Sequence, residues 1–400
     1  MLNAYIYDGA RTAFGKYCGA LAHVRPDDLA ASVIKALVLR NDFDPAIIDE
    51  VVLGYVCQSG EDSRNIARYA SLLAGLPVTV PGQTINRLCA SSLAAIVDCA
   101  HAITCGEGDV YIAGGVESMT RAPLTFNKSN SAYSKDIKIY DSAIGVRFPN
   151  PKIGKQFGHE SMPETANNVA KAENISREAC DEFALKSQQK WQEATSNEYF
   201  KDEIIPIHIP QKRGKPDIIV DTDEHPRAEG NIDKMAGMKP LFDDGVITAA
   251  NASGINDGAA AVLMANQAFG EKHNIKPLAR VLGGAAAGIE PSLMGLGPVP
   301  ACNKILKRLG LSLEQMDVIE INEAFAAQVL ADLKQLGLSA DDPRINPNGG
   351  AIAVGHPLGA SGARLVLTAA KQLQRTGGRY ALISMCVGVG QGLAVVIERA

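Results

Sequence analysis

The chain carries two cysteines and one histidine whose side chains could share the roles in a covalent group-transfer reaction. Cys89 opens an apolar helical stretch, His356 lies in a glycine-rich run at 355–362, and Cys386 precedes a second such run at 388–392. A thiolate is a strong nucleophile, and an imidazole exchanges protons near neutral pH. His356 and Cys386 each stand where a glycine-rich turn meets a predicted element, and Cys89 stands at a predicted helix start. We therefore expect nucleophile, base and acid roles to be shared among the three.

The position of Cys89 predicts how its thiol would be activated. A free cysteine is only a few per cent thiolate at neutral pH, but a helix N-terminus and a nearby imidazolium both stabilise the anion. We expect Cys89 to be stabilised in this way, and His356 to take its proton. His356 alone also fits a structural role, because Gly355 and Pro357 mark a tight bend.

The other cysteines show no pattern of their own. There are eight cysteines and no C-x-x-C pair, so the spacing fits neither a zinc site nor a disulfide framework. Most are expected to be buried small hydrophobic residues. No metal is implied. The full set is Cys18, Cys57, Cys89, Cys99, Cys105, Cys180, Cys302 and Cys386.

Composition bounds the class of protein. A chain of 400 residues, 46% hydrophobic and 21% charged, with a formal net charge of -5, predicts a multidomain soluble protein. No basic tract indicates nucleic acid binding. The first residues lack the features of a secretion signal, and no apolar run approaches the roughly 20 residues of a membrane span, so we expect a cytoplasmic protein.

Short apolar runs alternate with helical patterns, which predicts an α/β fold. A helix is expected from Asp28 to Leu39, with Asp28 as its cap. The predicted buried strands are Ala4 to Tyr7, Val51 to Val56, Val110 to Ala113, Val318 to Ile321, Tyr380 to Met385 and Leu393 to Ile397.

Two further features concern organisation. The alternation of strand and helix patterns stops from about 121 to 245. This predicts a partly structured insertion with a helix capped by Ser176. A weak repeat also relates the two ends of the chain: a loop leads to Cys89, a helix, a stop at Gly106 and a strand, and a loop leads to His356, a helix, a stop at Gly377 and a strand. Two such halves, if stacked, would bring both reactive residues to one cleft.

Two common interpretations are excluded. The run at 388–392 is no dinucleotide fingerprint, because the following residues 393–397 continue as a strand where a helix is required. No G-x-S-x-G elbow is present, which excludes serine hydrolysis of that type.

Four segments together resemble the thiolase family, the CoA-dependent enzymes that make or cleave 3-oxoacyl-CoA. They are the stretch around Cys89, Asn322-Glu323-Ala324-Phe325, the run around His356 and the run after Cys386. The resemblance extends over essentially the whole length. It implies a thiolase-like duplicated layered αβαβα core with an inserted loop domain. The implied division is 1–120, completed by about 246–272, then the insertion 121–245, then 273–400.

The resemblance also implies roles. Cys89 is the nucleophile, and His356 holds the thioester oxygen of the acetyl group together with a water bound by Asn322. Cys386 moves a proton at the substrate α-carbon, and the N–H of Gly388 joins that of Cys89 in a second oxyanion hole. Val389 stands where thiolases often carry a third glycine.

The resemblance implies that CoA is a co-substrate and that no cofactor is permanently bound. Arg227 is expected near the nucleotide and Ser253 near the pantetheine amides. Phe242, Met294, Phe325 and Met162 are expected along the CoA path, although core packing would explain most of them equally well. Ser161-Met162 replaces the His-Met of short-chain biosynthetic thiolases, which disfavours an acetoacetyl-CoA specialist.

Segments 25–31, 60–68 and 162–166 are most similar to 3-oxoadipyl-CoA thiolases. We therefore expect thiolysis of 3-oxoadipyl-CoA to acetyl-CoA and a shortened acyl-CoA, by a homotetramer or dimer. Its distal carboxylate would need a polar partner from the insertion, because an unpaired buried carboxylate is very costly. The candidates are Lys152, Lys155, Arg147 and Ser161.

Alternatives remain open at this point. A medium-chain 3-ketoacyl-CoA thiolase and an acetoacetyl-CoA thiolase use the same residues. A ketoacyl synthase shares the fold but carries a second histidine where this chain has Asn322. A cysteine hydrolase would not need Cys386, and a non-catalytic CoA or lipid carrier would not need the three reactive residues.

Overall fold

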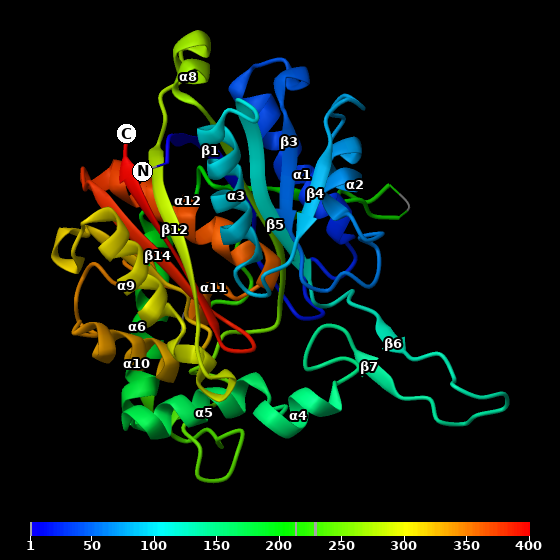
Figure 1. The fold of residues 1–400 in the computed structure, drawn as a ribbon, viewed down its shortest axis with the longest axis vertical. Helices are drawn as coiled ribbons and strands as arrows, with labels where there is room; N and C mark the ends of the chain where they lie inside the picture. Colours follow the sequence, from blue (N-terminus) through cyan, green and yellow to red (C-terminus); the bar gives the residue numbers. More distant parts are fainter. Residues whose placement is uncertain (1, 213, 228–229) are drawn as a thin grey trace.

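The computed structural model describes residues 2–212, 214–227 and 230–400. Its centre is a mixed sheet of eleven strands in these ranges, with the main order β13-β14-β15-β12-β1-β11-β5-β3-β4 (Figure 1). The strands are β1 (Ala4–Thr12), β3 (Glu50–Gly54), β4 (Gly82–Ile85), β5 (Val110–Ser118), β11 (Asn256–Ala265), β12 (Ala279–Gly288), β13 (Val318–Ile321), β14 (Tyr380–Val387) and β15 (Gln391–Arg399). Off this path, β2 (Gly15–Lys16) pairs with β11 and β8 (Ile204–Ile205) with β1.

The sheet contains the same four-stranded unit twice, which confirms the predicted repeat. In the first unit β3 and β5 are parallel, and β5, β11 and β1 are antiparallel to one another in turn. In the second unit β13 and β14 are parallel, and β14, β15 and β12 follow in the same antiparallel pattern. The two units join where β1 pairs antiparallel with β12.

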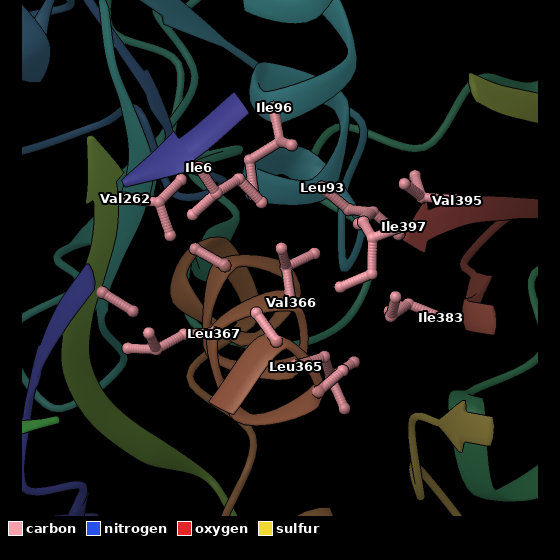
Figure 2. Close-up of a cluster of buried hydrophobic side chains, with 14 of the residues drawn as sticks. Ile6, Leu93, Ile96, Val262, Leu365, Val366, Leu367, Ile383, Val395 and Ile397 are labelled. Atoms are coloured by element: carbon pink, nitrogen blue, oxygen red, sulfur yellow. The ribbon is translucent and has the colours of Figure 1, made fainter. Parts of the chain in front are cut away.

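Two equivalent helices pack against each other between these units. They are α3 (Ser91–Cys105) and α12 (Leu358–Thr376), and each ends at a left-handed glycine, Gly106 with φ 76° and Gly377 with φ 74°. The N–H of Ala363 donates to Ser92 Oγ at 3.0 Å, which fixes the contact between them. Figure 2 shows Leu365, Val366 and Leu367 of α12 among apolar side chains from α3 and the sheet. The apolar core thus lies under both helix starts.

The remaining helices outside the inserted segment are distributed over the two halves. In the first half they are α1 (Pro26–Asn41), η1 (Pro45–Ile47), α2 (Ile66–Leu73) and α8 (Gln267–His273); in the second they are η2 (Pro291–Leu296), α9 (Pro298–Leu309), η3 (Leu313–Gln315), α10 (Ala326–Leu336) and α11 (Ala351–Val354). Asp28 is not the cap of α1: the helix starts earlier, at Pro26 after the N-cap Arg25. Proline is well suited to this first position, and Asp28 lies in the first turn.

The inserted segment contributes one strand to the central sheet. It contains β6 (Leu124–Phe126), β7 (Ile139–Asp141), α4 (Pro151–Phe157), α5 (Met162–Glu173), α6 (Arg177–Ser196), β8, β9 (Ile207–Ile209), β10 (Ile218–Val220) and α7 (Ile232–Ala236). The Ser176 side chain accepts from the N–H of Ala179, as predicted for the cap of α6. The β6–β7 hairpin projects away from the body (Figure 1). Since β8 pairs with β1 of the first half, the insertion is joined to the core through the sheet. The proposed domain division stays a prediction.

All six predicted strands are confirmed, with shifted ends, but β11 and β12 were not predicted. These two strands consist largely of alanine and glycine, which have low strand propensity, yet β11 is buried throughout. The prediction about apolar runs is also wrong in one place. The window Leu88–Cys105 is long and apolar enough for a membrane span by length and composition, with 61% of it buried inside the fold. Burial in a protein core explains such a helix equally well.

Candidate active site

Cys89 lies in a tight turn that leads into α3. Asn86 Oδ1 accepts from the N–H of Leu88 at 2.8 Å, and Ser91 Oγ donates to the Leu88 carbonyl at 2.6 Å while accepting from the N–H of Arg87. Leu88 has φ 45°, a left-handed conformation that is unfavourable for leucine. This strained turn presents the partly exposed Cys89 at the start of the helix.

His356 occupies the equivalent turn before α12. Its backbone N–H donates to Asn256 Oδ1 at 2.9 Å, and its Nδ1 lies 2.6 Å from Ser361 Oγ. Ser361 donates its own proton to the Pro357 carbonyl at 2.9 Å, so its oxygen accepts from Nδ1–H. The neutral ring therefore has its lone pair on Nε2. Gly355, at φ 105°, is required here, because a Cβ would approach the Asn256 side chain to about 2.5 Å.

Asn322 directly follows β13, and its side chain contacts the His356 ring. Its Nδ2 lies 3.3 Å from His356 Nε2, and its backbone N–H donates to the Ser384 carbonyl at 2.9 Å. Asn322 is fully buried, and its Oδ1 has no hydrogen-bond partner in the described part of the chain. An unpaired buried acceptor is costly unless a bound group satisfies it, so this atom suits a ligand or water at the site.

The loop after Cys386 closes over the Cys89 thiol. The backbone N–H groups of Gly388 and of Cys89 itself lie near the Cys89 sulfur and favour its anion, which lowers the pKa of the thiol. Cys386 is buried at the end of β14 and close enough to Cys89 to interact with its charge. A Cβ on Gly388 would lie 3.2 Å from Leu88 Cδ1 and 3.7 Å from Met162 Sδ, so the start of α5 also borders the site. Val389 follows at φ 63° and is 61% exposed, which marks a strained loop at the surface.

Burial dominates the electrostatics of the free site. Burial raises the pKa of Cys89 to about 11, although the backbone N–H groups of Gly388 and Cys89 lower it. Burial also raises the pKa of Cys386 well above its usual range, and the nearby Cys89 raises it further. Burial and then the Arg364 cation lower the pKa of His356 to about 3. The expected thiolate stabilised by an imidazolium is therefore wrong for the free protein, because burial penalises both charged forms. Thiol and imidazole are both neutral, and the proton must move as the sulfur attacks.

Several residues predicted to contact CoA lie next to the catalytic group. The N–H of Ser253 donates to the Ala324 carbonyl at 2.9 Å, and Ala252 forms a β-bridge with Phe325. Phe325 and Met294 are buried in the same apolar cluster as Cys386. These two side chains are therefore packed in the core beside the site, which is compatible with either a tunnel wall or plain packing.

Arg227 and Phe242 lie further out. Arg227 is exposed, and its backbone N–H donates to Gln188 Oε1 at 2.9 Å. After burial, the Arg227 charge is the second cause that lowers the pKa of His225 to about 4, so the two side chains are close. Phe242 is half-buried in the turn that leads to Gly245.

Sequence reasoning missed three supporting residues. Ser361 and Asn256 hold the His356 ring and turn, and Ser361 lies in the run at 355–362 that carried the resemblance. Glu117 was also missed: its carboxylate accepts from the N–H groups of Val56, Cys57 and Gly359, and so ties the His356 turn to the first half. Burial, opposed by these bonds, raises the pKa of Glu117 to about 7. Only the position of Glu117 at the end of a buried strand could have indicated it.

A duplicated α/β fold whose two equivalent helix starts supply a thiol and an imidazole, with a second thiol beside them, defines a thiolase-type acyltransferase. The chain belongs to the thiolase family: residues 4–268 match the model of the thiolase N-terminal domain, and residues 275–399 match that of the thiolase C-terminal domain. This confirms the family, the fold class and the enzyme class that the sequence predicted.

Relatives of known identity extend over the full length. The chain is 54% identical to a beta-ketoadipyl-CoA thiolase of Acinetobacter baylyi, with 100% of both chains covered. It is 54% identical, with the same coverage, to the 3-oxoadipyl-CoA/3-oxo-5,6-dehydrosuberyl-CoA thiolase of Escherichia coli K12. Among solved structures, human mitochondrial 3-ketoacyl-CoA thiolase in complex with CoA is 40% identical with a TM-score of 0.91, covering 100% of this chain and 98% of that one.

Proposed function

We propose that this enzyme cleaves 3-oxoadipyl-CoA with CoA, giving acetyl-CoA and succinyl-CoA through an acyl-Cys89 intermediate. The observations that carry the chemistry are the contact between Asn322 and His356, the Gly388 loop beside the Cys89 thiol, and the contact between the starts of α12 and α3. The full-length similarity to the Acinetobacter and Escherichia enzymes supports the substrate. CoA acts as a co-substrate, which the CoA complex of the human relative supports.

In the first half-reaction, the Cys89 proton passes to His356 Nε2 as the sulfur attacks the 3-keto carbon. The bond between C2 and C3 then breaks, and its electron pair leaves with the acetyl-CoA enolate. His356, now protonated, and a water held by Asn322 stabilise the enolate oxygen, while Cys386 protonates C2. The succinyl group stays on Cys89 as a thioester.

Before CoA reacts, the proton on His356 returns to the Cys386 thiolate. In the second half-reaction, incoming CoA gives its thiol proton to His356 Nε2 and attacks the acyl-Cys89 carbonyl. The N–H groups of Cys89 and Gly388 stabilise the oxyanion, and Cys89 leaves as a thiolate that takes the proton from His356 as succinyl-CoA forms. A thioester exchanged for a thioester makes the step nearly neutral in energy, which suits a cysteine nucleophile.

For the distal carboxylate, we propose Arg147 as the partner. It is the one candidate of the four that is partly buried and cationic: its Nη1 donates to the Cys57 carbonyl at 2.9 Å and also contacts Ser59 Oγ. Val56, next to Cys57, accepts a hydrogen bond from Asn86 in the nucleophile turn. In contrast, Lys152 and Lys155 are exposed on α4, and Ser161 is engaged by Glu164 in a capping box.

Comparing kcat/KM for 3-oxoadipyl-CoA and 3-oxohexanoyl-CoA tests this assignment. The two acyl chains have matched length, and a paired carboxylate should give a preference of about 10²-fold or more for the charged substrate. Arg147→Met should remove most of that preference and leave cleavage of the uncharged substrate within about threefold. A wild-type preference for 3-oxohexanoyl-CoA would move the enzyme to the fatty-acid branch of the family.

We further propose a cytoplasmic homo-oligomer, a tetramer or a dimer, built from the domains 1–120 with 246–272, 121–245 and 273–400. The oligomer is supported by large apolar side chains exposed on the β6–β7 hairpin, including Leu124, Phe126 and Ile139. Monomeric proteins rarely expose such a cluster without a partner.

A further inference from the structure

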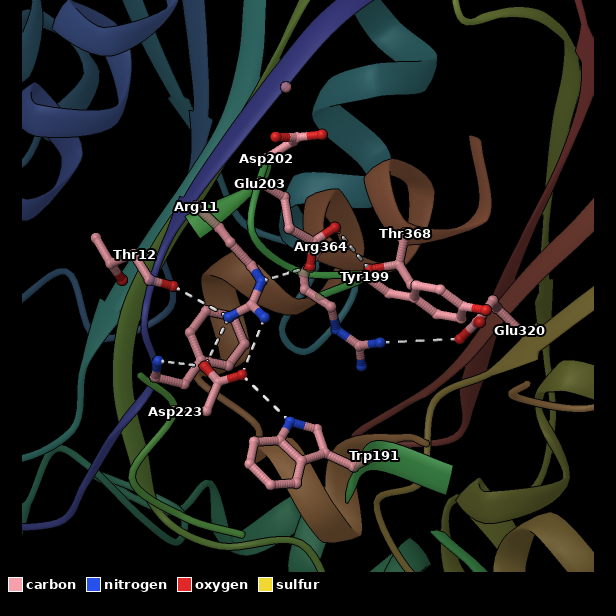
Figure 3. Close-up of polar contacts among 12 residues, drawn as sticks. Arg11, Thr12, Trp191, Tyr199, Asp202, Glu203, Asp223, Glu320, Arg364 and Thr368 are labelled. Atoms are coloured by element: carbon pink, nitrogen blue, oxygen red, sulfur yellow. Dashed lines mark hydrogen bonds and ion pairs between the residues drawn. The ribbon is translucent and has the colours of Figure 1, made fainter. Parts of the chain in front are cut away.

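A buried arginine and glutamate connect the two elements that carry His356 and Asn322. Glu320 lies on β13, shortly before Asn322, and Arg364 lies on α12, two turns after His356. Their side chains are 0% and 2% exposed, and Arg364 Nη1 lies 3.8 Å from Glu320 Oε2. Figure 3 shows the two side chains facing each other across the space between α12 and the sheet.

This pair is poorly satisfied. Both carboxylate oxygens of Glu320 and the Nε and Nη2 of Arg364 have no hydrogen-bond partner in the residues that the structure describes. Nearby Arg11 is very different: it bonds Glu203 Oε1 at 2.8 Å and both oxygens of Asp223 at 2.6 and 2.9 Å (Figure 3). A buried ion pair with unpaired atoms costs stability compared with apolar packing. Fold stability therefore accounts for Arg11 but not for Arg364 and Glu320.

The Arg364–Glu320 pair joins the same two elements as the contact between His356 and Asn322. The contact between Asn322 Nδ2 and His356 Nε2 joins the end of β13 to the turn before α12, and the Arg364–Glu320 pair joins the same two elements deeper in the core. Arg364 and Glu320 attract each other across 3.8 Å without a hydrogen bond, and this attraction holds α12 toward β13. Catalysis of this kind requires the base and its partner to be held within a fraction of an ångström.

We propose that Arg364 and Glu320 are positioning residues, whose buried pair fixes α12 against β13 so that Asn322 and His356 keep their catalytic contact. The inference rests on the proposed roles of His356 and Asn322. It does not depend on which 3-oxoacyl-CoA is the substrate.

The test compares the double variant Arg364→Met/Glu320→Met with wild type in thermal unfolding and in the rate of Cys89 acylation by labelled acetyl-CoA. Because the variant replaces both charges by apolar groups of similar size, we expect unchanged or higher stability. We expect the maximal acylation rate to fall at least tenfold, with half-saturation by acetyl-CoA within twofold. The variant Arg379→Met/Glu398→Met, at an ion pair whose arginine is 67% exposed, is the control and should leave both quantities unchanged.

A double-mutant cycle with Asn322→Ala decides whether the pair acts through the catalytic contact. The tenfold effect should shrink below twofold in the Asn322→Ala background, because the contact to be positioned is already gone. Full additivity, or a wild-type rate in the folded double variant, would overturn the inference. If the double variant does not fold, Arg364→Lys takes its place: it keeps the charge but loses the geometry, and a wild-type acylation rate in it would also overturn the inference. Failure of wild type to cleave any 3-oxoacyl-CoA, while acylation behaves as described, would count against the proposed function alone.

Discussion

Cys89 is partly exposed but carries a neutral thiol in the free enzyme, so its reactivity toward a simple alkylating agent should be low at neutral pH. The thiolate is the reactive species, and a pKa raised to about 11 means that its population grows tenfold per pH unit up to that value. We predict that the rate of Cys89 alkylation by iodoacetamide, followed by peptide mass spectrometry, rises continuously from pH 7 to pH 10. A plateau near pH 7 would indicate a preformed thiolate–imidazolium pair.

Cys386 serves a different step from Cys89, and the two can be separated. We predict that Cys386→Ala is still acylated at Cys89 by acetyl-CoA, because acyl transfer needs the nucleophile and His356. Carbon–carbon cleavage should fall by about 10² to 10⁴, the usual contribution of a general acid or base. Cys89→Ala is the control and should lose both reactions. Equal loss of both steps in Cys386→Ala would make Cys386 a structural residue.

At this scale the sequence predicted residue types but not their charge states. His356 and Cys386 were recognisable because reactive side chains stood beside glycine-rich turns, Cys89 because a thiol stood at a predicted helix start, and Asn322 through the family resemblance. The pKa directions were missed, because burial depends on elements that pack over the site from distant parts of the chain. The lone pair on Nε2 was also unpredictable, since it follows from where Ser361 sends its own proton.

The turn between α11 and α12 is the element on which His356 depends. Gly355 has φ 105° and faces Asn256, so an alanine would be strained and would collide with the residue that holds the His356 backbone. We predict that Gly355→Ala lowers the free energy of unfolding by about 1–3 kcal/mol and slows Cys89 acylation at least tenfold. Chemical denaturation and labelled acetyl-CoA measure the two effects.

Gly310 provides the matched control for this substitution. It also has a positive φ, 67°, at the end of α9, but a Cβ there meets nothing within 4 Å. Gly310→Ala should cost about 1–2 kcal/mol of stability from backbone strain alone, with acylation unchanged. Loss of acylation in both variants would show that the rate follows global stability and not the His356 turn.

Elements with strong apolar runs were predictable, and those without were not. β13 matched its predicted residues because Val318 and Ile321 bracket a short buried strand. β11 was missed because its four alanines and one glycine carry no strand signal, although it pairs with β1 and β5 and helices α1 and α12 pack against it. In such strands tertiary packing decides the structure, and local propensity does not.

For the whole molecule, the repeat explains how distant residues meet. Because the two units share one strand order, their helix starts are equivalent positions, and stacking α3 on α12 brings Cys89 and His356 to the same side. The sequence could indicate this arrangement from the matching loops and glycine stops. It could not predict that the insertion contributes β8 to the sheet, or that Glu203 and Asp223 from the insertion bind Arg11 of β1.

The β6–β7 hairpin should govern assembly. Its apolar side chains are exposed in the single chain, and Tyr133 near its tip is 101% exposed, so burial against other copies of the chain is the simplest way to remove this surface from water. We predict that Phe126→Ser/Ile139→Ser reduces the molar mass measured by light scattering after size-exclusion chromatography, without lowering the thermal stability of the core by more than a few degrees. Leu39→Ser, at an equally exposed leucine on α1, is the control and should leave the mass unchanged. An unchanged mass in the hairpin variant would assign assembly to another surface, such as the edge strand β4, whose outer side has no neighbour in the described sheet.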